Sequence, residues 1–310
     1  MTKEKARTLL LIDANSIIHR CFHALPPFTT SEKQPIGAIY GMANVFLKLW
    51  KERPDFAAAL FDRPEPTFRK KEYKEYKAQR PAAPNELISQ IIEAHNFFQK
   101  FGIKTFEMPS FEADDLIATL AYKFKKELDL KIVILTGDRD TLQLVDDNKI
   151  VVEAFKKGVS ETIIYDRAMV KDQYGLEPEQ LIDYKAMVGD PSDNIKGVPG
   201  VGPKTATTLI QKYGTLDNVF SHLKDDPKIE KKLAPFKNEA ELSRRLVVLN
   251  HEAPLEIKNI EELKTKEPEI EEYFGKLGFK AILERMKKSE KDNDRGEADV
   301  NKGGKQKSLF

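Results

Sequence analysis

Acidic residues gather in five short motifs of this 310-residue chain. Two aspartates follow runs of apolar residues that predict buried strands. The other seven acids form three clusters, each no longer than four residues. Carboxylates brought together repel one another unless cations lie among them, and hard divalent ions such as Mg²⁺ or Mn²⁺ prefer oxygen ligands. Two such ions held by carboxylates hydrolyse phosphodiesters. The nine residues are Asp13 in LLLIDAN, Asp62 in AALFDRP, Glu112, Asp114 and Asp115 in FEADD, Asp138 and Asp140 in TGDRD, and Asp190 and Asp193 in GDPSDN.

A simpler explanation exists for each acid taken alone. An aspartate after a strand is often a helix N-cap or a turn residue, so Asp13 by itself leaves both roles open. Three acidic clusters and two strand-end aspartates together are harder to explain as caps and surface charge. The set therefore favours a metal site.

Buried strands alternate with amphipathic helices in the first half of the chain. This order predicts a parallel α/β sheet with helices on both faces, and ligands of such sheets bind beyond the carboxyl ends of the strands. Asp13, Asp62 and Asp138 each follow a predicted strand, and the helix that carries FEADD begins at the same edge, so at least six carboxylates can face one cleft. The predicted strands are residues 8–12, 56–61 and 131–136, and the predicted helices are 14–24, 40–51, 84–101 (with Leu87, Ile88, Ile91, Ile92 and Phe98 on its apolar face) and 111–128.

Composition narrows the class of protein without indicating a partner. The chain is 40% apolar and 33% charged, with 51 Lys and Arg against 50 Asp and Glu, as in a soluble globular protein. Cys21 is the single cysteine, so no internal disulfide can form and a reducing compartment is indicated. No signal-peptide pattern and no apolar run of membrane length is found. We expect a cytoplasmic protein with no membrane partner. His19 and His23 stand four apart on a predicted helix, and core or surface roles are the simpler interpretation.

A basic segment follows Asp62 directly. The stretch from Arg63 to Arg80 holds seven Lys or Arg and three Glu, with Phe68, Tyr73 and Tyr76 interleaved. Cations bind phosphates and aromatic rings stack on bases, so this composition suits a single nucleic-acid strand. The alternative is a solvated charged helix or loop.

The second half of the chain predicts short helices without strands. Its distinctive motif is GVPGVGPKTA, residues 197–206. Its glycines suit a tight hairpin, and the helix that starts at Pro203 would offer free amides to a phosphate. Pro203 stands where a P-loop needs Lys, which argues against ATP and favours a grip on duplex backbone; a glycine-rich turn between helices is the alternative. The predicted helices are residues 181–188, 203–213, 216–223, 239–249 and 270–286, and residues 289–310 predict a disordered tail.

Together these motifs resemble the 5′-nuclease superfamily, most closely the 5′→3′ exonuclease domain of bacterial DNA polymerase I and its stand-alone relatives. LLLIDANSIIHRCFHAL, FDRPEPTFRKKEYKEYKAQRP, FEADD, TGDRDTLQLV and YKAMVGDPSDNIKGVPGVGPKTA stand in that family's order, and the likeness covers roughly residues 9–286. It implies a PIN-like α/β nuclease core in residues 1–175 with a helical arch at 63–84. It also implies a helical DNA-binding domain in residues 176–288 with a helix–hairpin–helix at 190–213. Ser110 departs from the Gly that the family often has before FEADD, and we expect it to be tolerated.

The resemblance also implies roles for individual residues. Asp13, Asp62, Glu112, Asp114 and Asp115 would hold a first, catalytic metal directly or through water, and Asp138, Asp140, Asp190 and Asp193 would complete a second metal region. The residues that would act on the scissile phosphate are Lys77, Lys185, Tyr76 and Arg80. Those that would bind DNA are Arg69, Lys70, Tyr73, Gly197, Gly200, Gly202, Lys204 and Thr205, with K⁺ held by carbonyls near Val198 and Val201.

The function implied is that of a free-standing, monomeric 5′→3′ exonuclease and flap endonuclease with two Mg²⁺ or Mn²⁺ ions. Its substrates would be DNA with a 5′ flap, nick or 5′ end and RNA primer–DNA junctions, in Okazaki fragment processing and repair. The terminal residues Gln306, Ser308, Leu309 and Phe310 resemble the motif that binds the bacterial sliding clamp. Two alternatives stay open: a non-catalytic, structure-specific DNA-binding protein, and a ribonuclease of the related fold.

Overall fold

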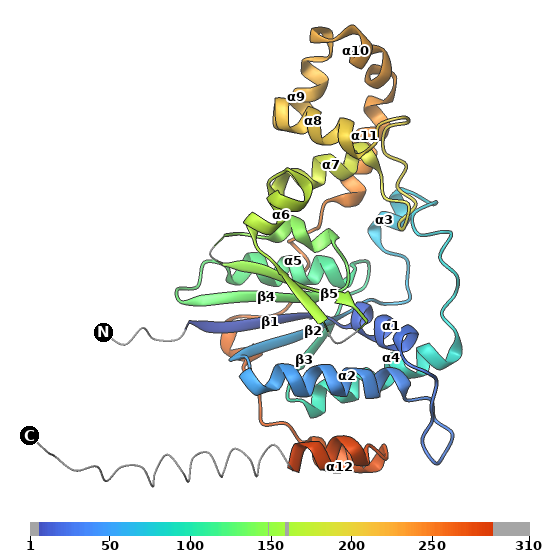
Figure 1. Cartoon of the computed structure of the whole chain (residues 1–310), viewed down its shortest axis with the longest axis vertical. Helices are drawn as coiled ribbons and strands as arrows, with labels where there is room; N and C mark the ends of the chain where they lie inside the picture. The colour runs from blue at the N-terminus through green and yellow to red at the C-terminus, as the bar shows by residue number, and fades with distance from the viewer. Residues whose placement is uncertain (1–5, 148, 159–160, 288–310) are drawn as a thin grey trace, which may run out of the picture.

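A six-stranded sheet forms the centre of the molecule (Figure 1). The computed structural model describes residues 6–147, 149–158 and 161–287. The strand order is β3-β2-β1-β4-β5-β6, with β1 to β5 parallel and β6 antiparallel to β5. The sheet is therefore mixed, and the predicted parallel order holds for five of its strands. The strands are β1 (Arg7–Asp13), β2 (Phe56–Phe61), β3 (Lys104–Glu107), β4 (Leu130–Thr136), β5 (Ile150–Lys157) and β6 (Glu161–Tyr165).

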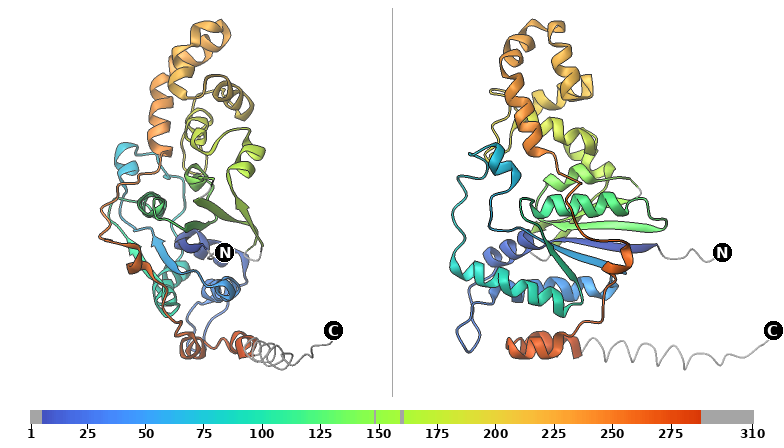
Figure 2. Two further views of the ribbon diagram at one scale, coloured as in Figure 1. Left: turned by 90° about the vertical axis from the view of Figure 1, so that its left-hand side faces the viewer. Right: turned by 180° about the vertical axis from the view of Figure 1, so that it is seen from behind.

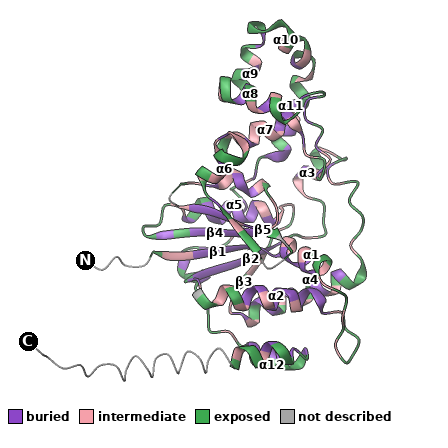
Figure 3. Cartoon of the chain, in the orientation of Figure 1, coloured by how far each residue is buried: buried purple, intermediate pink, exposed green. Residues whose placement is uncertain are grey.

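Helices cover both faces of this sheet because alternate side chains of each strand point to opposite faces. Leu9 and Leu11 of β1 pack into one buried cluster with α5, and Leu10 and Ile12 pack into another with α1, α2 and α4. Figure 3 shows the buried residues gathered in the sheet and on the inner sides of these helices. The helices are α1 (Ala14–Ala24), α2 (Gly37–Leu49), α4 (Asn85–Lys100) and α5 (Ala113–Phe124).

A helical region stands above the edge of the sheet where the strands end (Figure 1). Its buried side chains, such as Ala186 and Ile210, belong to the same cluster as α5, so the apolar core continues into it. After α11 the chain runs back along the core to α12 (Figure 2), held by Ala253 N–H on the Thr119 hydroxyl and Thr265 N–H on the Asp55 carbonyl. The remaining helices are α6 (Arg167–Tyr174), α7 (Leu181–Val188), α8 (Pro203–Tyr213), α9 (Leu216–Ser221), α10 (Pro227–Leu233), α11 (Lys237–Val247) and α12 (Ile270–Lys276).

The expected arch segment, residues 63–84, contains little regular structure. Its one helix is α3 (Phe68–Glu72), and turns follow at residues 74–79. The chain then runs without regular structure to α4, along the side of the core (Figure 1). Residues 63–84 are therefore less helical than predicted.

Three further details differ from the sequence-based expectation. The short edge strand β3, together with β5 and β6, was not predicted. The last predicted helix breaks after α12 because Gly278 adopts a φ of 75°, and residues 280–287 are helical again. Ile88 and Ile92 of α4 are exposed, so the apolar face of that helix is narrower than predicted. The predicted disordered tail, residues 289–310, lies outside the described residues. None of the described helices has the length and apolarity of a membrane span.

Candidate active site

The carboxyl ends of β1, β2 and β4 place three of the predicted acids side by side. Asp13 ends β1 and caps α1: its Oδ1 accepts the Ser16 amide at 2.9 Å and its Oδ2 accepts the Thr136 hydroxyl at 2.6 Å. The same Thr136 oxygen accepts the Asp138 amide at 2.9 Å. Asp62, beyond β2, accepts the amide that begins α5 at 2.7 Å. Asp13 and Asp62 therefore accept amides at helix starts, and all three aspartates lie at the edge where ligands of such sheets bind.

A cavity of ≈ 230 Å³ lies among these strand ends and the first turn of α5. Five of the nine predicted acids line it, together with polar and cationic side chains from α1 and from residues 63–84. The residues that line the cavity are Asp13, Asn15, Ser16, His19, Asp62, Lys77, Arg80, Glu112, Ala113, Asp114 and Asp138.

The electrostatics of this cavity fit a divalent cation. One carboxylate oxygen of Asp114 is buried without a hydrogen-bond partner. Burial, followed by the charges of Asp13 and Asp138, raises the pKa of Asp114 well above its ordinary value, and burial raises the pKa of Asp13 to about 7. With Asp62 and Asp138 these two acids form no ion pair with any described Lys or Arg. As the side chains stand, no three acids, histidines or cysteines in the described part of the chain are arranged to enclose an ion. The orphaned oxygen and the like charges are nonetheless what a bound cation would compensate.

Lys185 of α7 joins two further predicted acids. Its ammonium pairs with Asp140, two residues beyond Asp138, and with Asp190 at 3.0 Å. Burial opposes the charge of Lys185, but the two carboxylates still raise its pKa above the ordinary value. Burial and the nearby Asp138 raise the pKa of Asp140 to about 7. The helical region thus supplies a cation, Lys185, and a carboxylate, Asp190, to the rim of the core.

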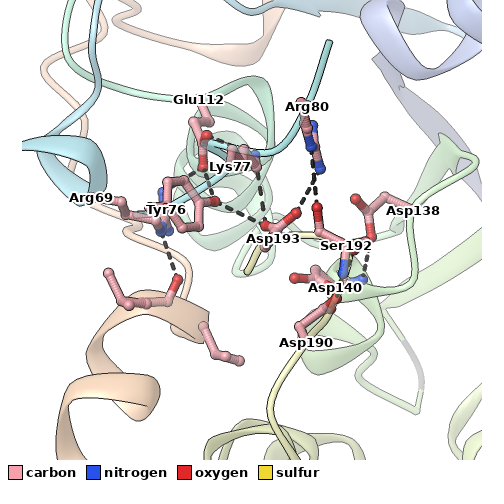
Figure 4. Close-up of polar contacts among 12 residues, drawn as sticks. Arg69, Tyr76, Lys77, Arg80, Glu112, Asp138, Asp140, Asp190, Ser192 and Asp193 are labelled. Atoms are coloured by element: carbon pink, nitrogen blue, oxygen red, sulfur yellow. Dashed lines mark hydrogen bonds and ion pairs between the residues drawn. The ribbon is translucent and has the colours of Figure 1, made fainter. Parts of the chain in front are cut away.

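Three residues of the basic segment reach acids on both sides of the cleft (Figure 4). The Tyr76 hydroxyl lies 2.9 Å from Glu112 and 3.0 Å from Asp193. Lys77 donates to Glu112 at 2.7 Å, and Arg80 pairs with Asp193 at 2.6 Å. Lys77 holds this position with a left-handed φ of 52°, a conformation that costs an L-residue about 1–2 kcal/mol.

The side chains of Arg69 and Asp115 do not point where the sequence-based roles, DNA binding and metal binding, require. Arg69 and Asp115 are 1% and 0% exposed and form a buried ion pair with each other. Arg69 therefore does not present its charge to DNA, and Asp115 does not line the cavity. Lys70 and Tyr73 lie in the same segment; Lys70 donates to the Tyr76 carbonyl, and Tyr73 packs against a small buried cluster that includes Tyr76 and Ile195.

The glycine hairpin divides into a packed part and an exposed part. Gly197 is buried, and a Cβ there would lie 2.3 Å from the Gly189 nitrogen. Its role is close packing, so its predicted contact with DNA is wrong. Gly200, Gly202 and Lys204 are exposed around the start of α8, where Pro203 is the first helical residue. Thr205 is half-buried; Val198 and Val201 are buried, and the Val198 carbonyl accepts the Val201 amide.

Sequence reasoning missed three residues that line the cavity, and a fourth, Thr136, that orients two of its acids. Asn15 accepts the Asp62 amide through its side chain at 3.1 Å, and Ser16 accepts the Gly137 amide at 2.8 Å. Thr136 orients Asp13 and Asp138, and His19 lines the cavity although it was interpreted as a core or surface histidine. Small polar residues within three positions of a strand-end aspartate are the signal that could have identified the first three.

Two family descriptions together match residues 8–271. Residues 8–175 match "5'-3' exonuclease, N-terminal resolvase-like domain" and residues 176–271 match "5'-3' exonuclease, C-terminal SAM fold". The 5'-3' exonuclease of Aquifex aeolicus is 38% identical over 91% of this chain and 96% of its own length. DNA polymerase I of Caldicellulosiruptor bescii is 44% identical over 91% of this chain, which spans 34% of that protein. The chain belongs to the 5′-3′ exonuclease family of DNA-hydrolysing enzymes.

Solved structures share the fold. The T5 D15 protein co-crystallised with metal ions superposes with a TM-score of 0.64 over 79% of this chain and 90% of its own, at 21% identity. The catalytic core of Rad2 in complex with DNA substrate superposes with a TM-score of 0.56 over 88% of this chain and 87% of its own, at 19% identity. These likenesses show that the fold of this chain, an α/β core with a helical region, is shared with both proteins.

Proposed function

We propose that this chain is a structure-specific 5′ nuclease that cuts DNA at 5′ ends and 5′ flaps with two divalent cations, Mg²⁺ or Mn²⁺. The observation that carries the proposal is the cavity beyond the strand ends. There, Asp13, Asp62, Asp114 and Asp138 face one another without an ion pair and Asp114 has an orphaned oxygen. Membership of the 5′-3′ exonuclease family supports the same reaction.

Two sets of residues would hold the cations. Asp13, Asp62, Asp114 and Glu112 would line the first position; Asp138 and Asp140, with Asp190 and Asp193 from the helical region, would border the second. Ions bound there would activate water and stabilise the leaving oxygen of the phosphodiester. Asp115 is left out of both sets because its carboxylate is already enclosed.

The chain's own cations would neutralise the substrate. Lys77 and Arg80 line the cavity; Lys77 pairs with Glu112 and Arg80 pairs with Asp193. A phosphate that enters would replace these carboxylates as the acceptor, so the two side chains would orient it and stabilise charge on its oxygens. Lys185 would do the same from α7.

Duplex DNA would lie against the exposed part of the hairpin. Gly200, Gly202, Lys204 and Thr205 present backbone amides and a cation at the start of α8, a geometry that binds phosphate without reading bases. A K⁺ ion held by backbone carbonyls near Val201 is part of this proposal. The 5′ strand would then pass residues 63–84 on its way to the cavity, and RNA primers joined to DNA would be cut in the same manner.

A partner is proposed on the sequence alone. Gln306, Ser308, Leu309 and Phe310 lie outside the described residues, and their likeness to the clamp-binding motif supports attachment to the bacterial sliding clamp. Removal of residues 306–310 should leave cleavage of free oligonucleotides unchanged and abolish clamp binding in calorimetry. Equal clamp affinity with and without the pentapeptide would refute the attachment.

The nuclease proposal is tested with a 5′-labelled double-flap DNA, incubated with Mg²⁺ and with EDTA. Cutting at the junction of single strand and duplex, only with the metal, is expected. Tight binding without cutting in Mg²⁺ or Mn²⁺ would favour the non-catalytic alternative. Faster cutting of single-stranded RNA than of flap DNA would favour the ribonuclease alternative.

A further inference from the structure

Arg69 is the most completely bonded side chain at the edge of the site. Its guanidinium has five N–H donors, and each has an acceptor within 3.0 Å. Two donate to the two oxygens of Asp115 and one to Glu112; the other two donate to the carbonyls of Leu246 and Val248. A phosphate would find no free donor on this residue.

Asp115 is enclosed in the same way. Its Oδ1 accepts Arg69 at 2.7 Å and the Asn250 amide at 2.8 Å. Its Oδ2 accepts Arg69 at 2.8 Å and the Glu112 amide at 3.1 Å. With both oxygens used twice and no exposed surface, the carboxylate has no lone pair directed at the cavity. Asp114, its neighbour in sequence, is the acid whose oxygen lacks a partner.

The ion pair joins three distant segments of the chain. Arg69 belongs to α3, in the segment that carries Tyr76 and Lys77; Asp115 belongs to the first turn of α5; and residues 246–250 are where the chain leaves the helical region at the end of α11. Figure 4 shows Arg69 beside Tyr76, with Glu112 above them. A movement of the helical region relative to the core would therefore displace Asp115 and with it the first turn of α5, where Glu112 is the N-cap.

Glu112 is the point at which this network reaches the cavity. Its Oε2 accepts Arg69 at 3.0 Å and lies 2.9 Å from the Tyr76 hydroxyl, while its Oε1 accepts Lys77 at 2.7 Å. Arg69 thus fixes one oxygen of a side chain whose other oxygen pairs with a cation that lines the cavity. Loss of Arg69 would leave the Tyr76 hydroxyl as the remaining side-chain partner of Oε2 and so loosen the orientation of Glu112.

We propose that Arg69 and Asp115 are a positioning pair: they orient Glu112 in the cavity and fasten the end of the helical region to the core, and neither contacts DNA or metal. The proposal rests on the proposed function, because it takes Glu112 and Asp114 as groups that face the cations. It replaces both roles that the sequence indicated for the pair.

The test compares Arg69→Lys and Asp115→Asn with Asp114→Asn in the full chain. Three quantities are measured: the number of Mn²⁺ ions bound by calorimetry, amide hydrogen exchange of residues 246–253, and turnover on flap DNA. Both positioning variants should lose roughly 10–100-fold in turnover and exchange faster at residues 246–253, while they bind as many Mn²⁺ ions as the wild type. Asp114→Asn should lose one ion and exchange at the wild-type rate.

Arg53→Lys is the matched control. Arg53 also donates to a carbonyl and a carboxylate of the returning chain, Thr265 and Glu267, but far from the cavity. This variant should retain wild-type turnover, which separates the loss of any anchoring arginine from the loss of this one. If Arg69→Lys fails to fold, Asp115→Asn tests the same pair from the other side.

Two results would overturn the positioning pair. One is that Asp115→Asn loses an ion as Asp114→Asn does, which would make Asp115 a ligand. The other is wild-type exchange at residues 246–253 in both positioning variants. An Asp114→Asn chain that binds every ion would contradict the metal assignment instead, and the exchange data would still decide the role of the pair.

Discussion

Gly197 offers a direct test of how the hairpin is built. In Gly197→Ala the new Cβ would lie 2.3 Å from the Gly189 nitrogen and 2.6 Å from the Val188 carbonyl carbon. Both are backbone atoms, so no side-chain rotation can relieve the contact, and the loop that carries Asp190 has to move. The φ of 63° adds a second cost, because an L-residue is strained there.

The magnitude follows from three contributions. Left-handed strain costs about 1–2 kcal/mol, and the lower entropy of the unfolded chain returns about 0.4–1 kcal/mol. Overpacking against fixed atoms adds about 1–3 kcal/mol. The free energy of unfolding should therefore fall by about 3 kcal/mol.

Gly200→Ala is the matched control from the same hairpin. Its φ is 75°, so it carries the same strain, but its Cβ would meet only the end of the Lys232 side chain at 3.4 Å. We expect a loss of about 1 kcal/mol. Urea unfolding followed by circular dichroism measures both variants. Equal losses for Gly197→Ala and Gly200→Ala would refute the close packing of Gly197 against Gly189.

Three further variants or reagents test the site and the core. Asp114→Ala should lower cleavage of flap DNA by roughly 10²–10³-fold or more with DNA affinity nearly unchanged; unchanged turnover in Mg²⁺ would contradict the assignment. Lys185→Met should bind Mn²⁺ at least roughly tenfold more tightly in calorimetry, because Asp140 and Asp190 lose their ammonium partner. The variant should nevertheless cut flap DNA more slowly. An unchanged Mn²⁺ affinity would contradict a competition between Lys185 and the metal for these two carboxylates. Burial raises the pKa of Cys21 to about 12, so a disulfide reagent at pH 8 should label native protein only as fast as it unfolds, and rapid labelling would contradict the buried thiol.

The strand-end half of the site was predictable from the sequence because it depends on short-range order. An apolar run followed by an aspartate places Asp13 and Asp62 at one edge of any parallel sheet, whatever the rest of the chain does. The same rule does not reveal Thr136, whose hydroxyl orients Asp13 from the neighbouring strand. The edge strand β3 was missed because four residues with little burial carry no strong periodic signal.

The direction of a charged side chain was not predictable in the same way. Arg69 stands in a run of cations, and nothing in the local sequence distinguishes it from Lys70 or Lys71. Its acceptors lie 43–46 residues away in FEADD and 177–179 residues away at the C-terminal end of α11. The role of Gly197 was not predictable for the same reason, because the sequence does not distinguish a glycine needed for close packing from a glycine needed for a turn.

The nine acids differ in which cation balances their charge, and this difference indicates where a metal ion would bind most tightly. Asp115 is balanced by Arg69, Asp140 and Asp190 by Lys185, and Glu112 and Asp193 by Lys77 and Arg80. Asp13, Asp62, Asp114 and Asp138 form no ion pair with the described cations, and they share one cavity. A divalent ion beside Asp13, Asp62 and Asp114 would meet carboxylates that no ion pair compensates, whereas an ion beside Asp190 or Asp193 would compete with the protein cations already paired to them. The two cations should therefore bind with unequal affinity. The second ion would displace Lys185 and Arg80 from Asp190 and Asp193. These two side chains would then be free to bind the phosphate.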